Sequence, residues 1–176
     1  MNKYYATVCV CFLSEILYPV TLGARETIYV PQDHETIQEA INAASSADIV
    51  VVSPGVYVEN ICFNGKEITV ASLYYTIQDP TYIEETVIDG GENDHVVSFD
   101  DDETELSILT GFTITNGRAE RGAGIFCRHA SPVISDLIIT CNTSINSVGG
   151  GVYLYNDSNA QLENILISNN SSITGG

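Results

Sequence analysis

The chain has little positive charge and no tryptophan. Its 176 residues include 6 lysines and arginines against 23 aspartates and glutamates, which gives a formal net charge of −17. A surface of this sign repels phosphate backbones and anionic lipid headgroups, so we expect no binding to nucleic acid. The absence of tryptophan removes the side chain that stacks best on sugar rings, although the 10 tyrosines can take over part of that role.

The chain also lacks a long hydrophobic run. Residues 6–13 are mostly apolar, but Glu15 follows closely, so the stretch is too short and too interrupted to span a membrane. With the small residues Gly23-Ala24 after it, the segment 1–24 is predicted to be a signal peptide. A mis-assigned start codon is the alternative. The signal peptide predicts a secreted or cell-surface protein.

The cysteines show no pattern typical of zinc binding, since no CxxC or Cys/His spacing is present. Beyond the predicted signal peptide three cysteines remain, which are Cys62, Cys127 and Cys141. Three cysteines cannot all pair within one chain. We expect buried free thiols that pack as small apolar side chains.

What the sequence does contain is a repeat in its C-terminal half. Each copy is an apolar run that ends in asparagine, at residues 112–116 (FTITN), 138–142 (IITCN) and 165–169 (ILISN). A glycine block follows each copy in step, at 122–126, 149–153 and 175–176. A fixed period of this length predicts stacked coils that bury their apolar faces against one another. The three asparagines, Asn116, Asn142 and Asn169, are interpreted as equivalent turn positions that stack along the axis.

The N-terminal part predicts a helix between strands. A short strand at residues 27–30 precedes Thr36 and Glu39, which have the spacing of a capping box. Apolar residues then recur along one helical face: Ile37, Ala40, Ile41 and Ala44. A strand buried on both sides is expected at 49–52, a turn at 54–55 leads into residues 56–59, and residues 74–85 are expected to form a long loop. We predict an all-β fold, a right-handed parallel β-helix (solenoid), with this amphipathic helix capping its open end.

Two motifs carry a resemblance to known families. Residues 36–41 (TIQEAI) and 55–59 (GVYVE) resemble the N-terminal cap and first coil of pectin-lyase-like right-handed β-helix proteins. Residues 112–116 with 122–125 (GAGI) are similar to the paired F-x-x-N and G-G-A-I motifs of polymorphic outer-membrane adhesins. The second resemblance implies association with a cell surface or outer membrane.

The resemblance does not extend to the catalytic motifs of the superfamily's enzymes. Residues 142–144 read NTS where polygalacturonases have NTD, and their Gly-His-Gly and Arg-Ile-Lys motifs are missing. The Trp-Ile-Asp-His motif of pectate lyases is excluded by the absence of tryptophan. The later catalytic segments of pectin methylesterases have no match either.

Two clusters of side chains are candidate sites. The cationic cluster could contact acidic sugars, and consists of Arg118, Arg121, Arg128 and His129. The carboxylates of Asp100, Asp101 and Asp102 are weak calcium candidates, because calcium prefers oxygen ligands. His34 and His95 are weaker candidates. No other cofactor is expected.

The function predicted from these observations is a non-catalytic adhesin, stalk or glycan-binding module that binds a polysaccharide or a host or cell-surface glycan. The alternative is the N-terminal part of a lyase, hydrolase or esterase that acts on uronic-acid-rich glycans. A monomer is expected. Because the sequence stops inside its third glycine block, residues 25–176 are predicted to be a β-helix domain truncated at its C-terminal end.

Overall fold

The fold is built from stacked parallel β-sheets. The computed structural model describes residues 25–146 and 148–173, so the predicted signal peptide lies outside the described residues. Within these ranges the strands form sheets of nine, four and two strands. All of the strand pairs in them are parallel. This confirms the prediction of a mostly β protein, and it is compatible with a β-helix.

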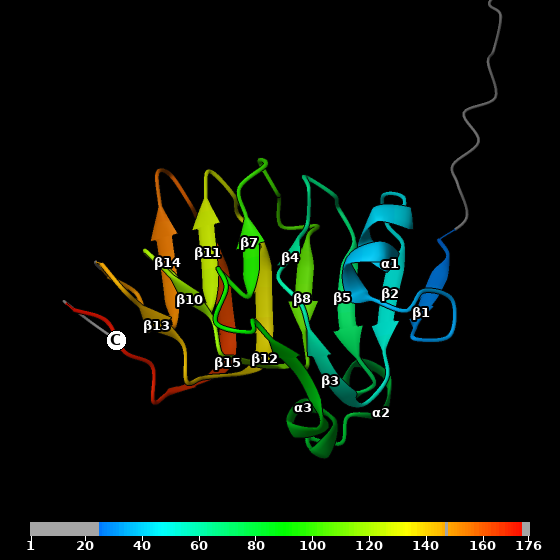
Figure 1. The fold of residues 1–176 in the computed structure, drawn as a ribbon. Helices are drawn as coiled ribbons and strands as arrows, with labels where there is room; N and C mark the ends of the chain where they lie inside the picture. The colour runs from blue at the N-terminus through cyan, green and yellow to red at the C-terminus, as the bar shows by residue number, and fades with distance from the viewer. Residues whose placement is uncertain (1–24, 147, 174–176) are drawn as a thin grey trace, which may run out of the picture.

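The nine-stranded sheet contains β1 (Thr27–Val30), β2 (Ile49–Val52), β3 (Gly55–Val58), β5 (Thr69–Ser72), β6 (Thr86–Asp89), β8 (Ile108–Thr110), β9 (Thr113–Thr115), β12 (Val133–Thr140) and β15 (Gln161–Ser168). The four-stranded sheet contains β4 (Ile61–Cys62), β7 (Val97–Phe99), β11 (Ile125–Arg128) and β14 (Val152–Tyr155). The small sheet pairs β10 (Arg118–Ala119) with β13 (Thr143–Ser144). In Figure 1 the strands stand side by side, from β1 at one end of the molecule to β14 near the other.

The core consists of apolar side chains that lie one above another on successive strands. Ile88 of β6 pairs with Ile114 of β9, which pairs in turn with Ile139 of β12, and all three are fully buried. Alternate residues of a strand point to opposite faces of the sheet, so every second side chain of these strands points into the interior. The rings of Phe63 and Phe99 extend the interior, with centroids 4.5 Å apart. Burial of a side chain of this size contributes about 2 kcal/mol.

The repeat is real, but its asparagines align differently from the prediction. Thr115, Thr140 and Ser168 are paired, which places Asn116, Cys141 and Asn169 at equivalent positions, each with a positive φ of 54° to 58°. Asn142 lies one position later. The prediction was wrong because it assumed that each asparagine closes its repeat at the same turn position, whereas these turns accept cysteine as well.

Asn142 instead belongs to a buried polar stack. Its side-chain oxygen accepts a hydrogen bond from the Gly117 N–H at 2.8 Å, 25 residues back, and its backbone N–H donates to Asn170 at 2.9 Å, 28 residues on. The first two glycine blocks align as predicted, because the Ala123 and Gly124 N–H groups donate to the carbonyls of Gly149 and Gly150, whereas the third block, at 175–176, lies outside the described residues. Small residues are required here, since a Cβ on Gly124 would collide with the carbonyl oxygen of Gly151.

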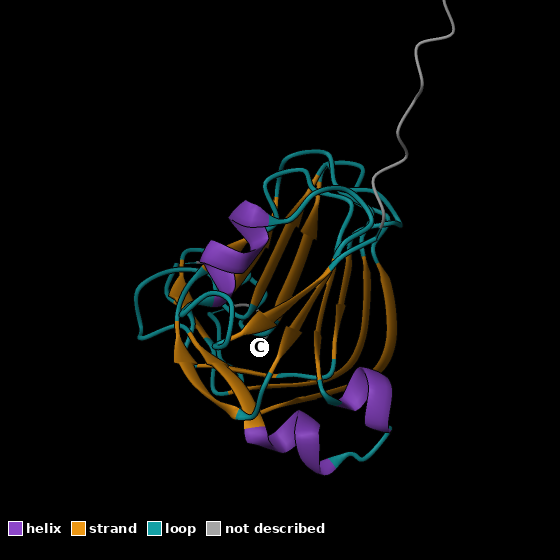
Figure 2. Ribbon diagram, turned by 90° about the vertical axis from the view of Figure 1, so that its right-hand side faces the viewer, coloured by secondary structure: helices purple, strands orange, loops and turns teal. Residues whose placement is uncertain are grey.

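Helix α1 (Ile37–Ala43) forms where the capping pattern predicted it. The Thr36 hydroxyl accepts from the Glu39 N–H at 3.1 Å, and Ile37, Ala40 and Ile41 are buried. The helix lies against β1, β2 and β4. Figure 2 looks onto the β1 end of the molecule and shows the helix on that side of the stacked strands.

Residues 74–85 were predicted to be a loop, but all except 78–80 are helical. They form α2 (Tyr74–Ile77) and α3 (Thr81–Glu85), which lie outside the sheets in Figures 1 and 2. Helix α3 lies against β6, β9 and β12, and the Thr113 hydroxyl donates to the Ile83 carbonyl at 2.9 Å. Each helix is too short to give a periodic apolar pattern, so the sequence carried no signal for them.

Candidate functional site

A pocket of about 430 Å³ lies beside the four-stranded sheet. Four separate segments of the chain line it, and their residues are Asp94, His95, Glu120, Arg121, Phe126, Arg128 and Tyr155. On β11 the pocket residues alternate with a buried neighbour, since Phe126 and Arg128 flank the buried Cys127. They therefore point to the outer face of the sheet, away from the core.

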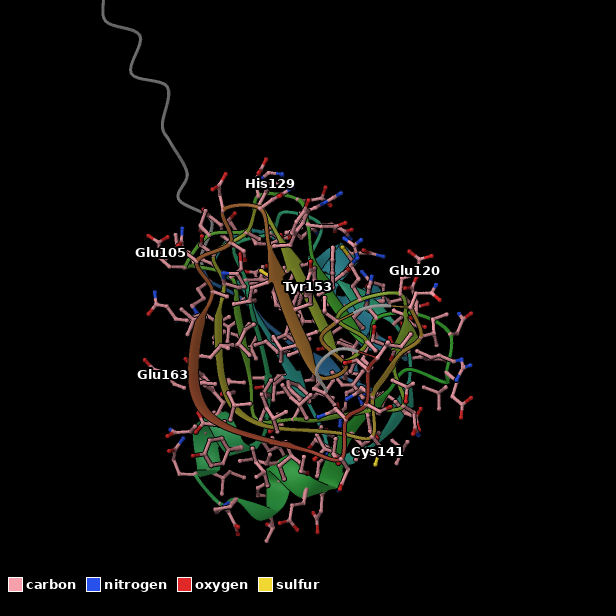
Figure 3. The ribbon with its side chains drawn as sticks, turned by 90° about the vertical axis from the view of Figure 1, so that its left-hand side faces the viewer. Glu105, Glu120, His129, Cys141, Tyr153 and Glu163 are labelled. Carbon is pink, nitrogen blue, oxygen red and sulfur yellow. The ribbon has the colours of Figure 1, made fainter. Side chains whose placement is uncertain are left out.

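Aromatic rings form a row along this outer face. The His95 and Phe126 rings stack with centroids 4.6 Å apart and an interplanar angle of 12°. Tyr153 follows Phe126 at 6.3 Å, and Tyr155 follows Tyr153 at 5.9 Å. The cause is the register, because Phe126 of β11 pairs directly with Tyr153 of β14. Figure 3 shows Tyr153 on the strand nearest the viewer at the β14 end.

His95 is held in a defined orientation at the end of this row. Its Nδ1 lies 3.0 Å from the Gly122 carbonyl oxygen, which can only accept a hydrogen bond, so Nδ1 carries the proton in this contact. Its Nε2 lies 3.7 Å from a carboxylate oxygen of Asp94. The side chain is 24% exposed. The ring thus contributes one stacked face and one polar nitrogen to the pocket.

Charged groups of both signs surround the rings. Arg128 forms an ion pair of 3.6 Å with Asp100, which lies next to the pocket on the preceding turn of chain. Among the residues that the structure describes, Arg121 has no carboxylate within ion-pairing distance. Asp94 and Glu120 are exposed carboxylates of the pocket wall. The site therefore offers hydrogen-bond donors, acceptors and apolar ring surface within one volume.

Two of the four predicted cationic residues come together here. Arg121 and Arg128 line the pocket, whereas Arg118 and His129 do not. Arg118 lies exposed on β10, and the His129 N–H donates to the carbonyl of Asn156 in a neighbouring turn. In Figure 3 His129 lies at a different edge of the molecule from Glu120.

Sequence reasoning gave His95 little weight and missed the other pocket residues. These are Asp94, Glu120, Phe126 and Tyr155. One signal was available. With the glycine blocks aligned, IFCR (125–128) lies beside VYLY (152–155), so Phe126 and Arg128 neighbour Tyr153 and Tyr155. The sequence grouped Arg121 with Arg128, but nothing in it indicated that Asp94, His95 and Glu120 would line the same pocket.

The predicted calcium residues separate in the structure. Asp100 and Asp101 lie with Cys62, and the possible ligand atoms of the three are within 4.8 Å of one another, but Asp102 is not part of this group. Burial raises the pKa of the Cys62 thiol, with Asp100 and Glu103 adding to the effect against two opposing hydrogen bonds. Calcium takes six to eight oxygen ligands, whereas this group offers two carboxylates and a thiol, so calcium binding at Asp100, Asp101 and Asp102 stays a prediction.

The cysteines of the described residues are free, as predicted, but they differ in burial. Cys127 is buried and accepts a hydrogen bond from the Ser158 hydroxyl at 2.9 Å. Cys62 is half-buried and Cys141 is exposed in its turn. The prediction of buried thiols is therefore correct for Cys127 and wrong for Cys141, because Cys141 occupies an exposed turn position with a φ of 58°.

Comparisons with known proteins assign no family. A scan against protein-family models finds no match to the chain, and a search of curated proteins finds none either. Within residues 25–146 and 148–173 there is no helix that is both long and apolar enough to cross a membrane. The geometry of the site is accordingly the basis for a functional assignment.

Proposed function

We propose that the protein is a right-handed parallel β-helix that binds carbohydrate at the pocket beside β7, β11 and β14. The solenoid assignment is supported by the uniformly parallel pairing, and by equivalent residues 25 and 28 positions apart. Parallel connections within one sheet are right-handed as a rule. The TIQEAI and GVYVE segments support a relationship to the pectin-lyase-like superfamily.

In this proposal α1 is the cap of the solenoid. Its Gln38 side chain supports the role, because the amide donates to the Cys62 carbonyl at 3.1 Å and accepts from the Cys62 N–H at 2.7 Å. The side chain thereby makes the two backbone bonds that a further strand would make with the edge of β4. An exposed strand edge is a site for unwanted pairing, and covering it is a recognised solution.

The observation that carries the binding function is the row of aromatic rings beside polar groups. Tyr155, which is 42% exposed, supplies flat apolar surface on which the C–H face of a sugar ring can lie, and Phe126 adds apolar contact area in the same pocket. Arg121 and the carboxylates of Asp94 and Glu120 can hydrogen-bond to sugar hydroxyls around that surface. The predicted signal peptide and the adhesin-like repeats favour a secreted or cell-surface protein that acts as an adhesin or stalk.

A catalytic function is the second candidate, and one observation favours it. His95, with a polar nitrogen turned toward Asp94, shares the pocket with Arg121, Arg128 and Glu120, so a proton acceptor and guanidinium groups face the same volume. An ultraviolet assay for unsaturated products, and a reducing-sugar assay, on a panel of polysaccharides would detect this activity. Turnover that is lost in His95→Ala would favour the enzyme over the binding module.

The binding function is tested by screening the protein on a glycan array and measuring the affinity of its best ligand by calorimetry. We expect Tyr155→Ala to weaken binding about 3- to 10-fold, as loss of one stacking ring should. The control is Tyr29→Ala on β1, since Tyr29 is similarly exposed, at 47%, but lies outside the pocket. Equal effects of the two substitutions would contradict the assignment of this pocket.

A further inference from the structure

We infer that this site selects neutral sugars over acidic ones, and that Asp94 and Glu120 are the residues that determine this specificity. The inference rests on the proposed function, because it names the ligand class of the same pocket. It differs from the sequence-based expectation that the arginines would contact acidic sugars. The reason lies in how the charges of the pocket are already paired.

The two arginines are not equally available to a ligand. Arg128 has its guanidinium 3.6 Å from the Asp100 carboxylate, so its charge is largely compensated by the protein. Arg121 then remains as one guanidinium against two carboxylates on the same pocket wall, Asp94 and Glu120. The Asp94 side chain is 65% exposed and lies at the pocket surface, where it faces an incoming ligand. The local balance of charge is therefore negative.

The charge of the whole chain acts in the same direction. At a formal net charge of −17, the molecule repels a polyanion at long range. Salt screens this repulsion beyond about 8 Å at physiological ionic strength, which leaves the two nearby carboxylates as the main local effect. An acidic sugar polymer meets repulsion during approach and again at contact.

The same groups suit an uncharged sugar. A carboxylate only accepts hydrogen bonds and a guanidinium only donates them, whereas a sugar hydroxyl does both. Asp94 and Glu120 can therefore accept from hydroxyls on a sugar ring stacked at Tyr155, and Arg121 can donate to the neighbouring oxygens. Hydrogen bonds to charged groups are stronger than those between neutral partners.

The experiment compares two oligosaccharides of equal length that differ only in oxidation at C6, a galactose oligomer and a galacturonic acid oligomer, by calorimetry. We expect the neutral oligomer to bind at least about fivefold more tightly at low salt, which is the effect of a single like-charge contact in water. Added salt should narrow the difference. Binding of neither oligomer, nor of any other sugar on the array, would overturn the proposed function and this inference with it.

The charge-removing variants test the residues themselves. Asp94→Asn and Glu120→Gln keep the shape of each side chain, and each should narrow the difference between the two oligomers by about two- to fivefold. Glu84→Gln on α3 is the matched control, since this exposed carboxylate lies outside the pocket, and it should leave the ratio unchanged. Tighter binding of the acidic oligomer, weakened by Arg121→Ala and by salt, would overturn the inference while leaving carbohydrate binding intact.

Discussion

At the scale of single residues, Asn142 is a buried amide that joins neighbouring turns of the chain. Its side-chain nitrogen lies 3.1 Å from the Ile114 carbonyl, 3.0 Å from that of Thr140 and 3.0 Å from the Asn170 amide oxygen. Its oxygen binds the Gly117 N–H. The Asn142 side chain is fully buried, so its removal would leave the groups that it binds without a hydrogen-bond partner. Each buried group left in this state carries a desolvation cost.

We therefore predict that Asn142→Ala lowers the free energy of unfolding by about 2–4 kcal/mol. The measurement is chemical denaturation followed by circular dichroism. The control is Asn93→Ala, because Asn93 is exposed in a turn, and this substitution should change stability by less than about 0.5 kcal/mol. A change of that small size for Asn142→Ala as well would show that the buried stack is not a source of stability.

The cysteines give a second prediction at this scale. Burial is the main factor that raises the pKa of the Cys127 thiol, with Glu103 adding to it and the Ser158 hydrogen bond opposing it. A raised pKa means that the thiol stays protonated at a pH where an ordinary thiol already reacts as thiolate. At pH 8 we expect iodoacetamide to label the exposed Cys141 at least about tenfold faster than Cys127, as peptide mass spectrometry would measure.

Denaturant should remove this difference, since unfolding exposes both thiols alike. Equal labelling rates of Cys127 and Cys141 in the native protein would contradict the burial of Cys127 on β11.

At the scale of elements, charged side chains from the next turn of chain form hydrogen bonds with the backbone at both ends of α1. The Glu59 carboxylate accepts from the Ile37 and Gln38 N–H groups at 2.9 and 3.0 Å. The Lys66 ammonium donates to the carbonyls of Ile41, Asn42 and Ala44 at 2.7 to 2.8 Å. The negative group lies at the helix N-terminus and the positive group at the C-terminus, which is the favourable order for the helix dipole.

We predict that Glu59→Ala lowers the free energy of unfolding by about 1–2 kcal/mol, because two N–H groups of the first turn lose their acceptor. Thermal or urea unfolding would measure it. Glu35→Ala removes an exposed carboxylate near the same helix end and serves as the control for charge alone. An equal loss of unfolding free energy in both variants would mean that net charge causes the change, and that the hydrogen bonds from the Ile37 and Gln38 N–H groups to Glu59 do not contribute.

Sequence patterns predicted the elements that have a strong local signal. The continuous apolar run IVVV predicted strand β2, and the apolar residues spaced along one helical face predicted α1. Both elements are present in the structure. The helices α2 and α3 have only 4 and 5 residues and carry no such spacing. Of the predicted cationic residues, Arg121 and Arg128 line the pocket. The positions of Asp94, His95 and Glu120 beside them depend on how separate loops meet in the tertiary fold, which no local pattern specifies.

At the scale of the whole molecule, the stacking of similar turns explains how a row of aromatic rings forms on the outer face. Each turn repeats the register of its neighbour, so a side chain that points outward on β11 has a counterpart on β14. Because inward and outward side chains alternate along each strand, the apolar core and the outer row of rings are formed by different residues.

The central claim is that carbohydrate binds at the outer aromatic row, and it can be tested by nuclear magnetic resonance. Aromatic carbon-labelled protein would be titrated with the neutral oligosaccharide that binds best on the array. We expect the ring signals of Phe126, Tyr153 and Tyr155 to shift together in proportion to saturation, while those of Tyr29 and Tyr57 stay in place. Shifts confined to rings outside the row, in a titration that reaches saturation, would contradict the account.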